Sequence, residues 1–189
     1  LPNMKRLFDI SLSLTLSVLF ICPCVVIAIA IKATSKGSVL YWSNRVGKDN
    51  NIFKMPKFRT MKINTPEVAS HLLINSSEAL TPFGKFLRKH SFDEIPQLWS
   101  IITGNMSFVG PRPALFNQND LIALRSKYFI DRLVPGLTGW AQINGRDELK
   151  IEDKVEKDLE YFEKRSFKFD LMILWLTIIR VFKKDGVSH

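Results

Sequence analysis

The sequence predicts a mixed, mainly α-helical fold with a small β-hairpin, held at a membrane by an N-terminal re-entrant helix that is broken at Pro23. Three observations lead to this fold class. Residues 10–31 carry no charge but contain a proline, two β-prone runs flank a polar turn, and later segments repeat apolar residues at helical spacing. We therefore expect residues 1–36 to form the membrane helix with its flanks and residues 37–189 to form a cytoplasmic domain with interfacial amphipathic helices.

The uncharged segment is long enough to cross a bilayer as one helix, which needs roughly 17–25 residues. Two features favour a helix that enters the membrane and returns to the same side. Pro23 removes a helical hydrogen bond within the segment, and basic residues stand on both flanks, namely Lys5, Arg6, Lys32 and Lys36. Because Lys and Arg favour the cytoplasmic side, both ends are expected there. A simple transmembrane span stays open as the alternative.

The first elements after this segment are a hairpin and a short helix. Residues 39–42 and 52–55 are β-prone, and the polar residues 47–51 between them predict a hairpin. Thr81 followed by Pro82 is a helix-start signal. The basic amphipathic helix that follows has two open explanations, one at the membrane interface and one packed on the protein core.

Two more helices are expected near the C-terminus. Apolar residues from Ile151 to Phe162 recur at helical spacing among charged residues, which indicates an amphipathic helix with a solvated charged face. The apolar run of residues 171–182 is too short to span a bilayer. It is expected to begin at an Asp170 N-cap and to rest against the membrane surface.

The charge balance favours anionic partners. The chain has 27 Lys and Arg against 18 Asp and Glu, a formal net charge of +9. Phosphates, acidic lipid and nucleic acid all fit this excess, and charge alone does not choose among them. The three histidines lack metal-ligand spacing. The two cysteines, Cys22 and Cys24, lie within the apolar segment, which argues against a disulfide framework or a zinc site.

An acidic pair, Asp93 and Glu94, is the first candidate for chemistry. Taken alone, Asp93 is best explained as the residue that opens a short helix over residues 94–99. A helix N-terminus also favours phosphate groups, which two carboxylates would repel. A divalent cation held by the pair would remove that repulsion and polarise a phosphoryl oxygen.

Basic residues that suit phosphate binding lie elsewhere in the chain. Pro111 and Pro113 restrict the backbone on both sides of Arg112, which gives a rigid mount for a guanidinium. Taken alone, a solvated charge is the simpler explanation for this arginine and for Lys57, Arg59, Arg88 and Arg146. Gly136, Gly139 and Gly145 lack the spacing of nucleotide-binding loops and indicate tight turns.

Several motifs, in this order, resemble the monotopic bacterial phosphoglycosyl transferases, a sugar transferase family that starts glycan assembly on polyprenyl phosphate. The resemblance is to the minimal form of the family and covers nearly the whole chain. It is carried by KRLFD at 5–9, KFRTM at 57–61, SFDEIPQL at 91–98, MSFVGPRP at 106–113 and GLTGWAQ at 136–142. The family commonly has Ser-Pro at the helix break, where this chain has Cys22-Pro23.

The resemblance implies a two-step reaction with a covalent intermediate. Asp93 would attack the sugar-bearing phosphorus of a UDP-sugar, release UMP and form an aspartyl phosphosugar that polyprenyl (undecaprenyl) phosphate then attacks. Glu94, beside Asp93, would hold Mg²⁺. Phosphate charge would be balanced by Arg112, together with Arg88, Arg146, Lys57 and Arg59.

The resemblance also implies the setting. Residues 37–189 would be the catalytic domain on the cytoplasmic face of the bacterial inner membrane, in contact with membrane lipid, and the reaction would start O-antigen, capsule or glycoprotein glycans. An N-acetylhexosamine or a modified derivative is the expected sugar, ahead of glucose or galactose. A non-catalytic basic module that binds acidic lipid or nucleic acid is the alternative, and it predicts salt-sensitive binding independent of Asp93 and Glu94. The lack of aromatic and basic RNA motifs argues against nucleic acid.

Overall fold

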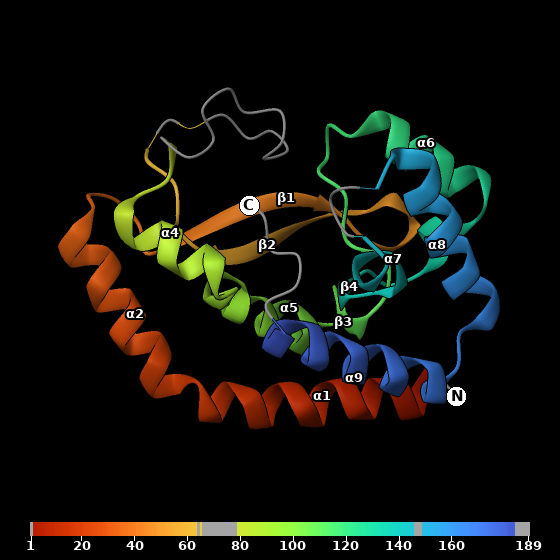
Figure 1. Ribbon diagram of the computed structural model, residues 1–189, viewed down its shortest axis with the longest axis horizontal. Coiled ribbons are helices and arrows are strands. Elements are labelled where there is room, and N and C mark those ends of the chain that lie inside the picture. The colour runs from red at the N-terminus through yellow and green to blue at the C-terminus, as the bar shows by residue number, and fades with distance from the viewer. Residues whose placement is uncertain (1, 64, 66–78, 146–148, 184–189) are drawn as a thin grey trace.

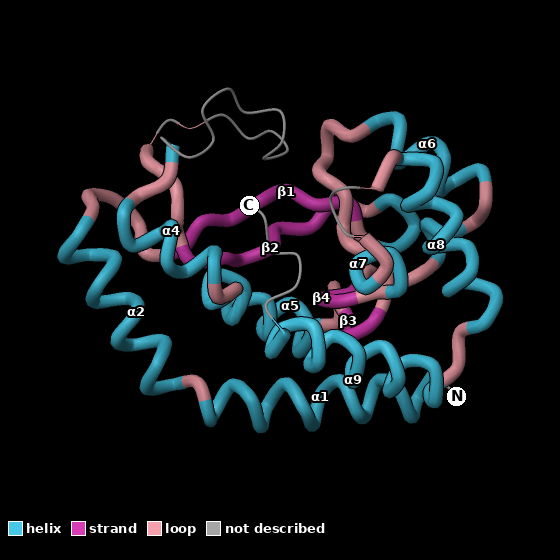
Figure 2. The backbone as a smooth tube through the Cα atoms, in the orientation of Figure 1, coloured by secondary structure: helices cyan, strands magenta, loops and turns pink. Residues whose placement is uncertain are grey.

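The computed structural model describes residues 2–63, 65, 79–145 and 149–183 of the chain. Figure 1 shows helices along its lower and left edges and strands in the middle. The strands form two small two-stranded sheets (Figure 2). The predicted mainly helical fold with a small hairpin is confirmed, whereas the second sheet was not predicted.

The N-terminal apolar segment forms two helices, α1 (Pro2–Leu19) and α2 (Ile21–Thr34), which are bent by 59° relative to each other. No single helix in the described residues is long and apolar enough to cross a membrane, although the bent pair together meets that criterion. The break falls at Phe20, and Pro23 lies in the first turn of α2. Because a proline ring clashes with the carbonyl group four residues earlier, the interruption lies before the proline rather than at it.

Both helices of this pair pack against the rest of the described chain (Figure 1). Leu12 and Leu16 of α1 contact the largest core cluster, which includes Ile173 of α9 (Phe167–Lys183). Ile27 and Ile31 of α2 belong to a second cluster with Phe58 and Leu87. Burial of these apolar side chains attaches both helices to the rest of the chain.

The predicted hairpin pairs β1 (Leu40–Val46) with β2 (Ile52–Phe58) in antiparallel register, with Leu40 opposite Phe58. A short turn, η1 (Lys48–Asn50), connects them. Asp49 and Asn50 adopt φ angles of 55° and 60° there, in the left-handed region that Asn and Asp tolerate better than most residues. The hairpin prediction is confirmed.

The helix predicted after Thr81 is α4 (Pro82–Lys89), and the Thr81 hydroxyl accepts a hydrogen bond from Gly84 N at 2.9 Å. Leu87 of α4 is fully buried, whereas Phe86 is 48% exposed. The core-packing explanation therefore holds for one face of this helix. Phe86, which precedes Leu87 in the helix, remains partly in contact with solvent.

The second sheet is parallel and pairs β3 (Ser107–Val109) with β4 (Gly136–Thr138), which is followed by α7 (Trp140–Ile143). Gly110 N donates to Thr138 O at 2.9 Å, so the two backbones touch. A Cβ atom on Gly136 would lie 2.1 Å from Gly110 N, and one on Gly139 would lie 2.1 Å from Gly110 O. The tight-turn prediction was therefore wrong for Gly136 and Gly139, because these glycines permit close backbone approach.

Further helices are α6 (Asn119–Lys127), η4 (Ile130–Arg132), α8 (Ile151–Lys164) and α9. Helix α8 matches its prediction, but Asp158 is buried rather than solvated. Helix α9 begins at Phe167, and the Ser166 hydroxyl accepts a hydrogen bond from Phe169 N at 3.2 Å. Asp170 lies inside the first turn and is buried, so its prediction as an N-cap was wrong.

Candidate active site

The acidic pair lies in a 3₁₀ turn, η3 (Phe92–Gln97), which leads directly into α5 (Leu98–Thr103). Ser91 precedes the turn with φ 56°, a left-handed conformation that is uncommon outside glycine. Asp93 is inside the turn and only 7% exposed. The explanation of Asp93 as a simple helix cap was therefore wrong, because Ser91 holds the cap position of η3.

Glu94 connects two of the predicted phosphate-binding residues. Its Oε1 atom lies 2.9 Å from Lys57 Nζ and 3.1 Å from Arg112 Nη2. Lys57 comes from β2, and Arg112 comes from the Pro111-Arg112-Pro113 segment after β3. Residues far apart in the sequence thus meet at one carboxylate oxygen.

The same charges surround Asp93. Burial raises the pKa of the Asp93 carboxyl group above its ordinary value, the positive charge of Lys57 opposes this shift, and the negative charge of Glu94 adds to it. Arg88 and Arg112 also act to lower the Asp93 pKa. Burial in turn lowers the pKa of Lys57, which Glu94 opposes. The cluster has three cationic groups for two carboxylates, which suits a site that receives an anion.

Arg88, from the last turn of α4, is held by the segment that follows β2. Its Nε donates to Thr60 Oγ1 at 3.2 Å, and its Nη2 lies 3.8 Å from Met61 Sδ. Burial lowers the pKa of the Arg88 guanidinium, while Asp93 and Glu94 oppose that shift. The KFRTM motif at 57–61 therefore contributes Lys57 to the cluster and fixes Arg88 beside it.

The structure places the Arg59 side chain next to the C-terminal end of α2 rather than next to Glu94. Its Nη2 donates to Ser35 O at 3.0 Å and to Ser35 Oγ at 2.7 Å, and the side chain is buried. Gly37, at φ 112°, lies so close that an added Cβ atom would be 2.0 Å from Arg59 Nη1. A cation near a helix C-terminus also interacts favourably with the helix dipole. Arg59 thus links α2 to the strand that carries Lys57, and its predicted phosphate contact stays a prediction.

Two arginines that the sequence did not single out hold the Arg112 segment. Arg45 Nη1 donates to Pro113 O at 3.2 Å, and Arg125 Nη1 donates to Arg112 O at 2.8 Å. No sequence motif marks either contact, because each depends on the fold bringing β1 or α6 to this segment. The last predicted phosphate-binding residue, Arg146, lies outside the described residues.

Asp93 and Glu94 are the two carboxylates of the cluster that could hold a divalent cation. The described part of the chain contains no group of three or more His, Cys, Asp or Glu side chains that could hold a metal ion. Mg²⁺ is commonly bound by one or two carboxylates together with substrate phosphates and water. The acidic pair fits a site of that kind, in which the substrate completes the ligand set.

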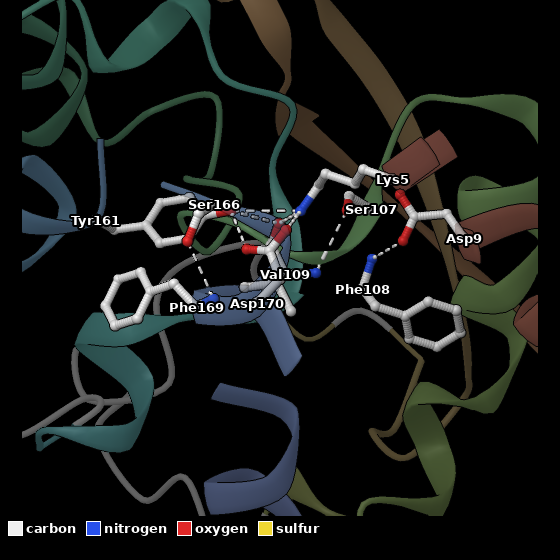
Figure 3. A network of polar contacts seen from close by, with 9 residues as sticks. All are labelled: Lys5, Asp9, Ser107, Phe108, Val109, Tyr161, Ser166, Phe169 and Asp170. Atoms are coloured by element: carbon white, nitrogen blue, oxygen red, sulfur yellow. Dashed lines mark hydrogen bonds and ion pairs between the residues drawn. The ribbon is translucent and has the colours of Figure 1, made fainter. Parts of the chain in front are cut away.

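A buried polar network joins α1 to the strand before Arg112 (Figure 3). Lys5 Nζ lies 2.5 Å from Asp170 Oδ2 and 2.9 Å from Val109 O. The Tyr161 hydroxyl donates to Asp170 Oδ1 at 2.7 Å, and burial together with Asp170 raises the Tyr161 pKa. Asp9 Oδ1 accepts from Phe108 N at 3.2 Å. The N-terminal helix is therefore fixed directly to β3, from which the arginine segment emerges.

Residues 2–184 match the family of bacterial sugar transferases. Over 187 residues the chain is 41% identical to the UDP-glucose:undecaprenyl-phosphate glucose-1-phosphate transferase of Escherichia coli K12, covering 95% of this chain and 40% of the relative. Over 199 residues it is 33% identical to the undecaprenyl-phosphate galactose phosphotransferase of Salmonella typhimurium, covering 97% of this chain and 41% of the relative.

A third relative is the uncharacterized sugar transferase EpsL of Bacillus subtilis. The chain is 37% identical to it over 191 residues, which cover 98% of this chain and 91% of EpsL. This chain thus spans about two fifths of the Escherichia coli and Salmonella typhimurium relatives and most of the Bacillus subtilis relative. The match extends over the hairpin, the acidic pair and the arginine segment alike. The chain belongs to the bacterial sugar transferase family.

Proposed function

We propose that this chain transfers a sugar 1-phosphate from a UDP-sugar to polyprenyl phosphate and releases UMP. One observation carries the proposal: Asp93 is buried among Glu94, Lys57, Arg88 and Arg112. A carboxylate shielded from water and surrounded by cations suits attack on a phosphorus atom, where negative charge must be balanced. Relatives in the same family have names that state this type of reaction.

In the proposed reaction an Asp93 carboxylate oxygen attacks the sugar-bearing phosphorus of the UDP-sugar. A bond forms between that oxygen and the phosphorus, the bond to the bridging oxygen breaks, and UMP leaves with the bonding electron pair. An oxygen of polyprenyl phosphate then attacks the same phosphorus and releases the Asp93 carboxylate. The acyl phosphate formed in between makes the scheme covalent catalysis with two displacements.

The basic residues of the cluster have distinct proposed roles. Arg112 binds a phosphate of the donor, because a guanidinium on a restricted backbone suits a tetrahedral anion. Lys57 and Arg88 add further positive charge near Asp93. Mg²⁺, when bound at Glu94 and Asp93, supplies charge neutralisation for the diphosphate.

The bent helix pair is proposed to enter the membrane and return to the cytoplasmic face. Apolar side chains along it are exposed, among them Leu14, Val18, Leu19, Val25 and Ile29. Both ends are attached to residues 37–189, the proposed catalytic domain: Lys5 contacts Asp170 and Ser35 contacts Arg59. A full span would separate these two attachments, whereas a re-entrant pair keeps both.

The donor sugar is open to a direct test. The family resemblance implies an N-acetylhexosamine or a modified derivative, whereas the Escherichia coli and Salmonella typhimurium relatives have names that state glucose and galactose. A panel of UDP-sugars with undecaprenyl phosphate and Mg²⁺ should give UMP from one of these sugars. Failure of every UDP-sugar to give UMP would contradict the proposed function and favour the non-catalytic membrane module.

We expect both ends of the helix pair to be labelled from the cytoplasmic side. In a chain with Cys22 and Cys24 changed to alanine, Asn3→Cys and Lys36→Cys should each react with a membrane-impermeant maleimide in inverted vesicles and not in intact cells. Asp153→Cys, at an exposed position on α8, marks the cytoplasmic side. Labelling of only one end in inverted vesicles would refute the re-entrant arrangement and support a span.

We expect the acid limb of the pH profile to follow Asp93. The nucleophile must be ionised, and burial raises its pKa, so kcat/KM should fall as the pH falls through this raised value. Arg88 lowers the Asp93 pKa, so Arg88→Gln should move the acid limb to higher pH. Lys85→Gln, at an exposed position on the same helix, should leave the limb in place. An acid limb that Arg88→Gln does not move would exclude Asp93 as the group that controls it.

A further inference from the structure

Arg125 connects a buried ion pair to the backbone of Arg112. On one side, its Nε and Nη2 atoms lie 3.0 Å and 2.6 Å from Asp158 Oδ2. On the other side, its Nη1 atom donates to Arg112 O at 2.8 Å. Arg125 is 8% exposed and Asp158 is 1% exposed, so neither side chain can exchange these contacts for water.

We propose that Arg125, oriented by Asp158, is a positioning residue that sets where the Arg112 guanidinium lies. This inference rests on the proposed function, in which Arg112 binds the donor phosphate. Arg125 does not touch the acidic pair in the described contacts; it acts through the Arg112 carbonyl group. Its contribution is the placement of another residue.

The two prolines leave this placement incomplete. Each proline ring fixes its own φ and biases the residue before it, but the peptide plane after Arg112 still needs a partner to hold it. Arg125 holds the Arg112 carbonyl, and Arg45 holds the next carbonyl, that of Pro113, at 3.2 Å. Two guanidinium groups from α6 and β1 thus fix successive peptide groups.

Packing alone would not fix these peptide groups. A small cavity lies beside the segment and is lined by Pro111, Ala114 and Arg125 itself. Space next to a loop lets it shift unless directional bonds prevent the movement. The bonds from Arg125 supply that direction, and Asp158 keeps the guanidinium from turning because a buried charge stays with its partner.

The chemistry of the position requires an arginine. One planar group reaches both the carboxylate of Asp158 and the carbonyl of Arg112, through donors that point in fixed directions. A lysine keeps the charge that Asp158 needs but presents a single ammonium group. Arg125→Lys is therefore expected to keep the ion pair with Asp158 and to lose the hydrogen bond to Arg112 O.

A double-mutant cycle tests the inference through UMP release from the best UDP-sugar. Arg125→Lys is expected to lower kcat/KM by about 10- to 100-fold in the wild-type background, as loss of an orienting contact does. In the Arg112→Ala background the same change is expected to cost less than about threefold, because the residue it positions is gone. Leu121→Ala, a core change on the same helix, should cost the same factor in both backgrounds.

Two results overturn the inference: Arg125→Lys costs the same factor with and without Arg112, or it costs nothing in the wild-type background. Where Arg112→Ala leaves no measurable turnover, the same cycle is run on the dissociation constant of UDP with Mg²⁺, with the same criteria. If Arg125→Lys does not fold, the double variant Arg125→Met/Asp158→Leu replaces it in the cycle. This variant removes the ion pair without leaving one buried charge alone. Lack of UMP release from wild-type protein contradicts the proposed function instead, and the UDP cycle then decides the positioning role separately.

Discussion

Asp93→Asn is expected to abolish UMP release, with a loss of at least about 10³-fold in kcat, because the amide cannot form the acyl phosphate. The substitution keeps the size of the side chain, so the buried turn η3 should stay folded. UMP formed from the UDP-sugar in the presence of Mg²⁺ and undecaprenyl phosphate is the measurement. Sedimentation with membranes should be unchanged.

Two companion measurements isolate the nucleophile. Asp153→Asn, which removes an exposed carboxylate on α8, should leave UMP release near wild type. A stoichiometric burst of UMP without lipid acceptor is expected from the wild type and not from Asp93→Asn. Undiminished turnover by Asp93→Asn would remove Asp93 from the nucleophile role while leaving family membership untouched.

Lys5→Met is expected to destabilise the folded chain by about 3 kcal/mol, because it leaves the buried Asp170 carboxylate without its cation. Lys5 also loses its hydrogen bond to Val109 O, so α1 should detach from β3 more easily. Guanidinium-induced unfolding in detergent micelles measures the change. The shift should appear in the midpoint rather than in the slope.

The matched double variant shows whether charge is the reason. Lys5→Met/Asp170→Leu leaves no unpaired charge. The Tyr161 hydroxyl, which lies 3.3 Å from Val109 O in the wild type, can donate to that carbonyl group, so most of the lost stability should return. Lys157→Met, which removes the cation of a partly exposed ion pair on α8, should leave the unfolding midpoint close to that of the wild type. Equal losses for the single and double variants would show that packing by Lys5, and not its charge, holds α1.

Local patterns predicted the elements that are stabilised locally. The hairpin at 40–58 follows from β-prone runs around a polar turn, and α4 begins at its Thr81 cap as predicted. The position of Asp170 was misjudged because an acidic residue before an apolar run resembles a cap, whereas this one is buried against Lys5 from the other end of the chain. Similarly, Asp158 lies in a charged helix, and its burial beside Arg125 depends on the packing of α6 against α8.

Most of the residues that lie together at the candidate site were selected from the sequence, whereas their arrangement was not predicted. The motifs selected five residues that lie close together in the structure, namely Asp93, Glu94, Lys57, Arg88 and Arg112. Arg59 was selected by the same motif as Lys57, yet it donates hydrogen bonds to Ser35, because the chain has left β2 at that point. Arg45 and Arg125 lie outside every motif, and their importance depends on backbone carbonyl groups that any sequence provides.

The backbone contact between Gly110 and Gly136 fixes the distance between the arginine segment and β4 without any side chain. The segment that carries Arg112 begins at Gly110, whose N atom donates to Thr138 O, and Pro111 O accepts from Gly136 N at 2.9 Å. The separation of the two segments is therefore set by the length of a peptide hydrogen bond, which varies little between proteins. Changes in side-chain rotamers or in core volume elsewhere can alter stability while this spacing is kept. The start of the arginine segment is therefore held at a distance from β4 that does not depend on side-chain packing.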